Sequence, residues 1–357
     1  MSELGLLRFE EGYFERIWGG NKLRTLFGKD IPKKPIGEAW MISDHPVHES
    51  VVAEGPLAGQ TLRDLLKRDT KSILGQRPQL TPGGRFPLLL KILDASQVLS
   101  VQVHPNDECA ARLGEPDVGK TEMWHVLQAD PGSELICGLD TSVTPPLMAE
   151  AVAANALEPL MNAYGVERGS TFLLPAGVIH AIGAGIVLAE IQQNSDLTYR
   201  LYDWGRLDDQ GKPRQLHVDK AMEAIHFGFK HDGPAKPLAC TISGTQSLVL
   251  SACQYFAAEL VAIDGTFERE TQGQTFHILL AINGEMTVEA NASSVTLNVG
   301  QALLVPGCAH SFTVTGHGDI LDYYVPDLQH DIIEPLRKEG HSPQEITQLG
   351  AQTFSVI

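Results

Sequence analysis

Residues 169–206, GSTFLLPAGVIHAIGAGIVLAEIQQNSDLTYRLYDWGR, combine a buried strand, a tight turn, a histidine and two charged residues in one segment. The run 171–174 is apolar and partly β-branched and ends at Pro-x-Gly, which predicts a buried strand that enters a turn. His180 follows this turn, where its imidazole can face the inside of a barrel. A lone histidine in such a place is more often a hydrogen-bonded core residue than a metal ligand. Its role therefore depends on partners elsewhere in the chain.

The second half of this segment predicts a hairpin. If residues 186–192 form a strand, alternate side chains share one face, and Glu190 lies among residues that face a cavity. After the turn at residues 194–196, Arg200 lies on a returning strand. An antiparallel hairpin with this loop would bring Glu190 and Arg200 to the same barrel mouth. The pair is then either catalytic or an ordinary cross-strand ion pair of small energy.

A second group of polar residues lies upstream, within residues 91–127. Gln102 and His104 are two positions apart, so on a strand their side chains point to the same side. Glu122 follows eighteen residues after His104 and opens another apolar run. Together with His180 they form a mixed nitrogen and oxygen set that suits Zn²⁺ with one open position. Two histidines and a carboxylate can also hold Fe²⁺.

With these motifs the chain resembles type I mannose-6-phosphate isomerase, of the cupin superfamily, in its short bacterial form. The resemblance spans about residues 8 to 325 and is specific because five motifs occur in the family's order. The motifs are RIWGG (16–20), IGEAWMIS (36–43), LLLKILDASQVLSVQVHPND (88–107), GKTEMWHVL (119–127) and the segment 169–206.

The resemblance implies a zinc-dependent isomerase that interconverts mannose 6-phosphate and fructose 6-phosphate through an enediol-type proton transfer. It places a single Zn²⁺ in each chain, on ligands that match Gln102, His104, Glu122 and His180. The positions that match the family's catalytic residues are Arg200, Glu190 and Lys120, and those that match its substrate-binding residues are Lys91, Ser100, Lys120 and Arg200.

The proton-transfer base is left open between two residues. Glu190 is the first choice, if burial keeps its pKa near the working pH. Lys120 is the second, because it lies two residues before Glu122 and so shares its strand face. Two other classes of protein remain as alternatives: a metal-dependent cupin dioxygenase or epimerase, and a non-catalytic sugar-phosphate-binding cupin. A dioxygenase or epimerase has no need of Lys91, Lys120 and Arg200 together. A binding protein that senses sugar phosphates and regulates genes would require a DNA-binding module, and the sequence shows none.

The expected fold is mainly β, with two tandem cupin-type jelly-roll barrels. Residues 1–232 are predicted to form the metal-binding domain, with helical insertions at about 61–75 and 146–160. Residues 233–357 are predicted to form a second cupin-like domain with a short helical tail. Residues 300–310 repeat the pattern of 169–180, which indicates an internal duplication without a second set of ligands. Asn283-Gly284 in the second half is typical of a hairpin turn.

The composition restricts the kinds of molecule that the protein is expected to bind. The 357-residue chain has a formal net charge of −17, which argues against nucleic acid and against anionic membranes, because both bind basic surfaces. A phosphorylated substrate would therefore need a local cluster of basic residues. The five cysteines are scattered, without a CxxC pair, and are expected to be reduced thiols. We expect a cytoplasmic enzyme, without a membrane partner, that acts as a monomer on a small sugar phosphate.

Overall fold

The computed structural model describes residues 4–207 and 211–350. The chain divides into two compact units, and neither is a continuous piece of sequence. Unit 1 draws on Met1–Gly12, Trp40–Leu90 and Ala235–Ile357, and unit 2 on Tyr13–Ala39 and Lys91–Pro234. The division into residues 1–232 and 233–357 stays a prediction about domains. The mainly β composition is confirmed, since strands make up most of the regular structure of both units.

Two sheets contain most of the strands of unit 2. The first has six strands in the order β1 (Gly12–Gly20), β2 (Ile36–Ile42), β5 (Leu88–Ala95), β12 (Ile186–Gln193), β7 (Glu122–Ala129), β10 (Thr171–Leu174). The second has five, in the order β13 (Tyr199–Tyr202), β6 (Val101–Val103), β11 (His180–Ile182), β8 (Glu134–Leu139), β9 (Met161–Gly165). The predicted strand and turn at residues 171–180 are confirmed as β10, the following turn and β11.

Buried apolar side chains explain why these segments form central strands. All residues of β5 and β12 are buried, which is the pattern of a strand covered on both faces. One core cluster of unit 2 includes Trp124, Phe172 and Leu188. Another includes Val103 and Ile179. Each large apolar side chain that is fully buried contributes about 1.5–3 kcal/mol, so these clusters hold the strands rigidly.

The predicted hairpin between residues 186 and 202 is wrong. Strand β12 pairs with β7, and Glu190 lies opposite Trp124. Strand β13 lies in the other sheet, where it pairs with β6 and places Arg200 opposite Gln102. The turn between the two strands carries the chain from one sheet to the other, because each strand buries its side chains against a different partner.

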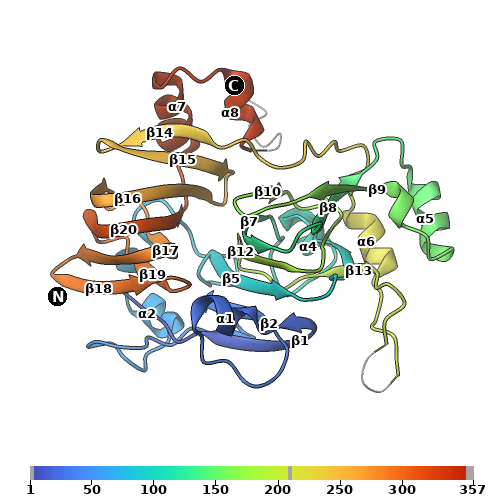
Figure 1. Cartoon of the computed structure of the whole chain (residues 1–357), viewed down its shortest axis with the longest axis horizontal. Helices are drawn as coiled ribbons and strands as arrows, with labels where there is room; N and C mark the ends of the chain where they lie inside the picture. Colours follow the sequence, from blue (N-terminus) through green and yellow to red (C-terminus); the bar gives the residue numbers. More distant parts are fainter. Residues whose placement is uncertain (1–3, 208–210, 351–357) are drawn as a thin grey trace. The chain divides into compact units, whose positions relative to one another are not determined.

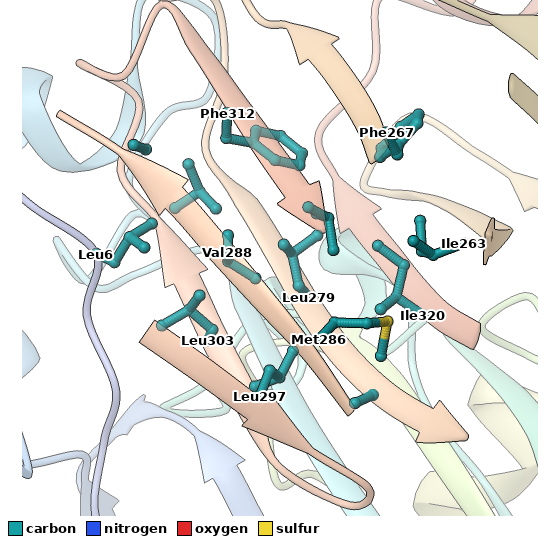
Figure 2. Packing of buried hydrophobic residues seen from close by; sticks show 14 of the residues in the cluster. Leu6, Ile263, Phe267, Leu279, Met286, Val288, Leu297, Leu303, Phe312 and Ile320 are labelled. Carbon is teal, nitrogen blue, oxygen red and sulfur yellow. The ribbon is translucent and has the colours of Figure 1, made fainter. Parts of the chain in front are cut away.

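Unit 1 is built on a seven-stranded antiparallel sheet (Figure 1). Its strands follow the order β14 (Leu238–Ile242), β15 (Thr245–Ala252), β16 (Ala257–Glu270), β20 (Ser311–Tyr324), β17 (His277–Ala290), β18 (Ser293–Asn298), and β19 (Ala302–Val305) pairs with β17. A small hairpin joins β3 (Asp44–His45) to β4 (His48–Glu49). Figure 2 shows Leu279 and Val288 of β17 and Ile320 of the neighbouring strand β20 in one apolar cluster with Leu6.

The Asn283-Gly284 pair does not form the predicted hairpin turn. It lies inside the 14-residue strand β17, where the register with β20 shifts between Ala281 and Asn283. Gly284 has φ 69° and lies opposite Gly318, and a Cβ on Gly284 would stand 1.9 Å from the carbonyl oxygen of His317. The pair therefore makes a β-bulge at which two strands approach closely, a role that requires glycine.

A network of buried polar side chains lies on strands β16, β17 and β20 of this sheet. Arg269 donates to both carboxylate oxygens of Glu259, at 2.7 and 3.1 Å, and to Asp322 at 3.0 Å. Asp322 lies 2.8 Å from Nδ1 of His277, and the Tyr324 hydroxyl donates to Glu259. All five side chains are almost fully shielded from solvent. A single guanidinium thus compensates two buried carboxylates, as buried charges require.

The helices are short and cap the strands. They are α1 (Lys22–Phe27), α2 (Leu62–Arg68), α3 (Thr70–Leu74), α4 (Asp107–Arg112), α5 (Pro145–Ala153), η1 (Glu158–Leu160), α6 (Val218–Ala224), η2 (Leu328–Ile333), α7 (Glu334–Lys338) and α8 (Pro343–Gln348). Thr61 caps α2 by accepting from the Asp64 amide, and Asp69 separates α2 from α3 by capping α3. The insertion at 61–75 is therefore two helices. None of the helices in residues 4–207 and 211–350 has the length and apolar content needed to cross a membrane.

Candidate functional site

Three of the expected ligands converge in unit 2. His104 follows β6, Glu122 begins β7 and His180 begins β11, and one donor atom of each lies within 4.8 Å of the others. All three side chains are buried. In the described part of the chain this is the only such group formed by histidine, cysteine, aspartate and glutamate. His310, in the repeated motif of unit 1, is exposed and belongs to no such group.

Backbone carbonyls orient both imidazoles. Nδ1 of His104 lies 2.6 Å from the carbonyl oxygen of Leu197, and Nδ1 of His180 lies 2.8 Å from that of Val178. A carbonyl oxygen only accepts, so each Nδ1 carries the hydrogen and each Nε2 presents a lone pair. The two Nε2 atoms are 3.1 Å apart. They lie 3.5 and 3.4 Å from the carboxylate of Glu122.

The protonation states match a set of metal donors. Burial, reinforced by the charge of Lys120, lowers the pKa of His180 to about 3 and that of His104 well below its usual value. Both imidazoles are therefore neutral near pH 7, the form that binds a metal. The buried Oε1 atom of Glu122 accepts no hydrogen bond from a described residue. Two aligned lone pairs and an unsatisfied carboxylate oxygen fit a divalent cation.

Gln102 is placed beside this group by strand pairing. Its Cα atom lies opposite that of His180, between β6 and β11. On its other side it lies opposite Arg200 of β13. Its half-buried amide can add an uncharged oxygen donor to the two imidazoles and the carboxylate.

Lys120 lies among the same donors. Its Nζ pairs with the Glu122 carboxylate and is 3.2 Å from Nε2 of His104 and 3.8 Å from Glu190. Burial alone would lower the pKa of Lys120, but the carboxylates of Glu122 and Glu190 outweigh it and raise the pKa above its usual value. Lys120 is therefore a permanent ammonium near neutral pH, which counts against it as a proton acceptor.

Glu190 lies on β12, facing Trp124 of β7. The indole Nε1 of Trp124 donates to Oε2 of Glu190 at 3.1 Å, while the buried Oε1 has no hydrogen-bond partner in the described structure. Burial raises the pKa of Glu190, although Lys120 and Lys91 act against this. A carboxylate that is held in place on one oxygen, accepts no hydrogen bond on the other and is raised in pKa has the properties of a general base.

Two carboxylates that the sequence analysis did not identify also line this region. Nζ of Lys91 lies 3.5 Å from Glu190, 3.9 Å from Glu38 and 4.0 Å from Asp196. Glu38 is buried on β2 and also binds Arg16 at 2.8 Å. Glu38 lies within the apolar run IGEAWMIS, and a charged side chain in a buried run normally has a partner of opposite charge. This position was the sequence signal that could have identified Glu38 as part of the site.

Arg200 is not brought to Glu190. Its Nε donates to the buried hydroxyl of Ser100 at 3.1 Å, and its Nη1 donates to the Gln215 carbonyl at 3.0 Å. Within the described residues no ion pair joins it to Glu190, so the alternative of a cross-strand salt bridge is wrong, and the catalytic role of the two residues stays a prediction. The Arg200 and Ser100 side chains instead contact each other, beside Gln102 on strands β13 and β6.

Comparison with known proteins gives one consistent answer. Residues 6–122 match the catalytic domain of type I phosphomannose isomerases, and residues 245–325 match the cupin domain of mannose-6-phosphate isomerases. The mannose-6-phosphate isomerase of Streptococcus mutans is 36% identical over 86% of this chain and 94% of its own length. Mannose-6-phosphate isomerase ManA of Bacillus subtilis is 35% identical over 88% of this chain and 97% of its own length.

A solved structure agrees with these sequence matches. The crystal structure of the mannose 6-phosphate isomerase from Bacillus subtilis covers 90% of this chain with a TM-score of 0.81 at 31% identity, and 99% of that protein is matched. The likeness at 90% of the chain therefore extends over both units.

Proposed function

The chain belongs to the type I mannose-6-phosphate isomerases, and from this premise we propose how its buried site carries out the isomerisation with one zinc ion. The observation that carries the proposal is the convergence of His104, Glu122 and His180 within 4.8 Å, next to the buried carboxylate of Glu190. Converting mannose 6-phosphate to fructose 6-phosphate moves one proton from C2 to C1 and one from the C2 oxygen to the C1 oxygen.

The carbon-bound proton is assigned to Glu190. Its free Oε1 takes the proton from C2 and returns it to C1 of the enediol, so the carboxylate is regenerated at the end of the cycle. Trp124 holds the other oxygen, and Lys91 and Lys120 stabilise the charged form. Lys120 itself is protonated, and we assign it to the stabilisation of negative charge on the substrate oxygens.

Zinc is the metal we assign to the site, on Gln102, His104, Glu122 and His180. When bound it acts as a Lewis acid toward the sugar oxygens. Two neutral imidazoles, one carboxylate and one neutral amide leave the ion with more positive charge than a second carboxylate would. Lys91, Ser100 and Arg200 are the remaining substrate contacts in this proposal, because they supply positive charge and a hydroxyl beside the metal donors.

We also propose that the enzyme works as a cytoplasmic monomer. Every residue assigned to the site comes from unit 2 of one chain, so no second subunit is needed to complete it. Four of the five cysteines are buried, and the described structure contains no disulfide, as suits a reducing compartment.

The purified protein is expected to contain about one zinc ion per chain, because the four donors form a single site with a position left open for substrate. His104→Ala or His180→Ala should lose the metal, since each removes a donor whose orientation is fixed by a backbone carbonyl. Metal analysis of the dialysed proteins measures this, and His310→Ala, at an exposed histidine, is the matched control. Two ions per chain would contradict the single site, and an active enzyme without metal would disprove the zinc assignment.

Turnover of mannose 6-phosphate in a coupled assay is the direct test of function. We expect chelators to block it and unphosphorylated mannose to react far more slowly, because the sugar alone gives the basic residues no anion to bind. Equal rates with the two sugars would contradict the role assigned to these residues. Absence of any turnover by the zinc-loaded protein would leave a binding protein or another cupin enzyme as the remaining classes.

A further inference from the structure

Lys120 lies on a segment without regular structure. Residues 115–121 belong to no helix or strand, and β7 begins only at Glu122. A lysine side chain turns about four single bonds, so a lysine on a loop has no fixed position of its own. Nζ of Lys120 nevertheless lies among defined groups, 3.2 Å from Nε2 of His104 and 3.8 Å from Glu190. Contacts outside the strand ladder must therefore hold the backbone at this residue.

Side chains anchor the backbone on both sides of Lys120. Before it, the N–H group of Gly119 donates to Oδ1 of Asp107 at 2.8 Å. After it, the N–H group of Thr121 donates to Oε1 of Gln193 at 2.9 Å, and the N–H group of Gln193 donates to the carbonyl oxygen of Thr121 at 3.1 Å. The loop is thus held by α4, to which Asp107 belongs, and by the end of β12, to which Gln193 belongs.

The loop also lies directly against the start of α4. The N–H group of Lys120 itself donates to the carbonyl oxygen of Pro105 at 3.0 Å. A Cβ atom on Gly119 would stand 2.5 Å from the carbonyl carbon of Asn106 and from the amide nitrogen of Asp107. This close approach requires glycine, and it explains how the short side chain of Asp107 reaches the loop.

The side chain of Gln193 joins the two anchors. Its Nε2 donates to Oδ1 of Asp107 at 3.0 Å, the same oxygen that accepts from Gly119. One buried amide group therefore accepts a hydrogen bond from Thr121 and donates one to the carboxylate. This arrangement suits an amide, because an ionised glutamate in the same place would have no donor and a lysine would have no acceptor.

Gln193 acts on the site through the backbone of the loop. It is the last residue of β12, three positions after Glu190, so the two side chains point to opposite faces of the strand. Glu190 lies on the face that carries the site, and Gln193 lies on the other. Gln193 therefore contacts the loop and not the reacting atoms, which makes it a positioning residue.

We propose that Gln193, together with Asp107, fixes the position of the Lys120 ammonium group for catalysis. This rests on the proposed function, in which Lys120 stabilises negative charge on the substrate oxygens. Electrostatic stabilisation of this kind depends on charges that are in place before the reaction begins. A displacement of about 1 Å can lower the rate about 100-fold, even when the residue that causes it is far from the chemistry.

Gln193→Met tests this, because methionine has a similar length but makes neither hydrogen bond. We expect kcat for mannose 6-phosphate to fall about 10–100-fold, while KM changes only a few-fold and the metal content per chain stays that of the wild type. Gln128→Met, on β7, is the matched control. This variant also loses two hydrogen bonds, those to Lys22 and Asp130, so it should lower Tm similarly and keep the wild-type kcat.

A double-mutant cycle shows whether Gln193 acts through Lys120. Lys120→Met should itself lower kcat, and the addition of Gln193→Met should then lower it by at most about twofold, because no ammonium group is left to position. The same loss in both backgrounds would overturn the proposal. Lys120→Met with the wild-type kcat would refute the role of Lys120 in the proposed function as well. A slow Lys120→Met beside a fast Gln193→Met would refute the positioning alone.

Asp107 gives a second test at an exposed residue, where substitution leaves the core intact. Asp107→Ala removes the acceptor of Gly119 and should lower kcat as Gln193→Met does. Asp107→Asn keeps Oδ1 and should restore most of the wild-type kcat. A fall in Tm without a fall in kcat, or a loss of metal in Gln193→Met, would overturn the proposal. The hydrogen bonds would then serve folding or the orientation of Glu122.

Discussion

Glu190→Gln is expected to lower kcat about 10²–10⁴-fold, the usual contribution of a positioned general base. Glutamine keeps the shape of the side chain and an oxygen that accepts from Nε1 of Trp124, but it cannot take a proton from C2. Metal content and KM should stay near their wild-type values, because Glu190 is not among the metal donors. Steady-state kinetics of the zinc-loaded protein measures the effect, and Glu134→Gln, at an exposed position of β8, is the control.

Two further measurements identify the base. Exchange of the substrate C2 proton with solvent should slow as much as kcat does, and exchange at the wild-type rate would transfer the role to another residue such as Lys120. The second measurement is the pH dependence of kcat. Burial raises the pKa of Glu190 above 4.5, so the carboxylate is lost as pH falls through this raised value. The acidic limb of wild-type kcat should therefore lie above pH 4.5 and disappear in Glu190→Gln.

Arg269→Met is expected to destabilise unit 1 by about 3–5 kcal/mol, the cost of breaking a buried ion pair by removing one partner. Methionine fills similar space but leaves the carboxylates of Glu259 and Asp322 buried without their cation. Urea denaturation measures the loss. Arg112→Met, which breaks an exposed ion pair with Glu223, is the matched control and should leave the urea midpoint close to that of the wild type.

The pH dependence distinguishes lost charge from lost packing. In the wild type, burial acts to raise the pKa of Asp322, but His277 and Arg269 outweigh it and hold the pKa below its usual value. This carboxylate therefore stabilises the folded state above its unfolded pKa, and that stability is lost as pH falls through the folded pKa. In Arg269→Met one of the two groups that lower this pKa is gone and the carboxylates are more readily protonated, so the deficit should shrink as pH is lowered. A deficit that does not change with pH would show that packing, rather than charge, holds this network together.

Local signals in the sequence were sufficient wherever neighbours along the chain decide the structure. The helical insertion at 61–75 and the strand before Pro175 both lie where spacing and turn chemistry placed them. The metal donors were found by the resemblance, because Glu122 and His180 are 58 residues apart and no local pattern connects them.

The wrong predictions share one cause. In each case the structure depends on pairing with a strand that is remote in the sequence. Strand β13 follows β12 closely but pairs with β6, which buries Tyr199 and Leu201 in a different core. Asn283-Gly284 carries the local signal of a turn, yet pairing with β20 keeps β17 extended through it. Glu38 was overlooked because its partners, Arg16 and Lys91, come from other strands.

The proposed metal donors come from two different sheets: Glu122 from β7 of the six-stranded sheet, Gln102 and His180 from β6 and β11 of the five-stranded sheet. An ion held there ties the two sheets together, so its supply becomes part of the folding equilibrium. By mass action a metal at a thousand times its Kd adds about 4 kcal/mol to the stability of the state that binds it. A cell short of the metal that fills this site would then lose this enzyme through unfolding and proteolysis as well as through inactivity, and the abundance of the enzyme would follow the supply of that metal.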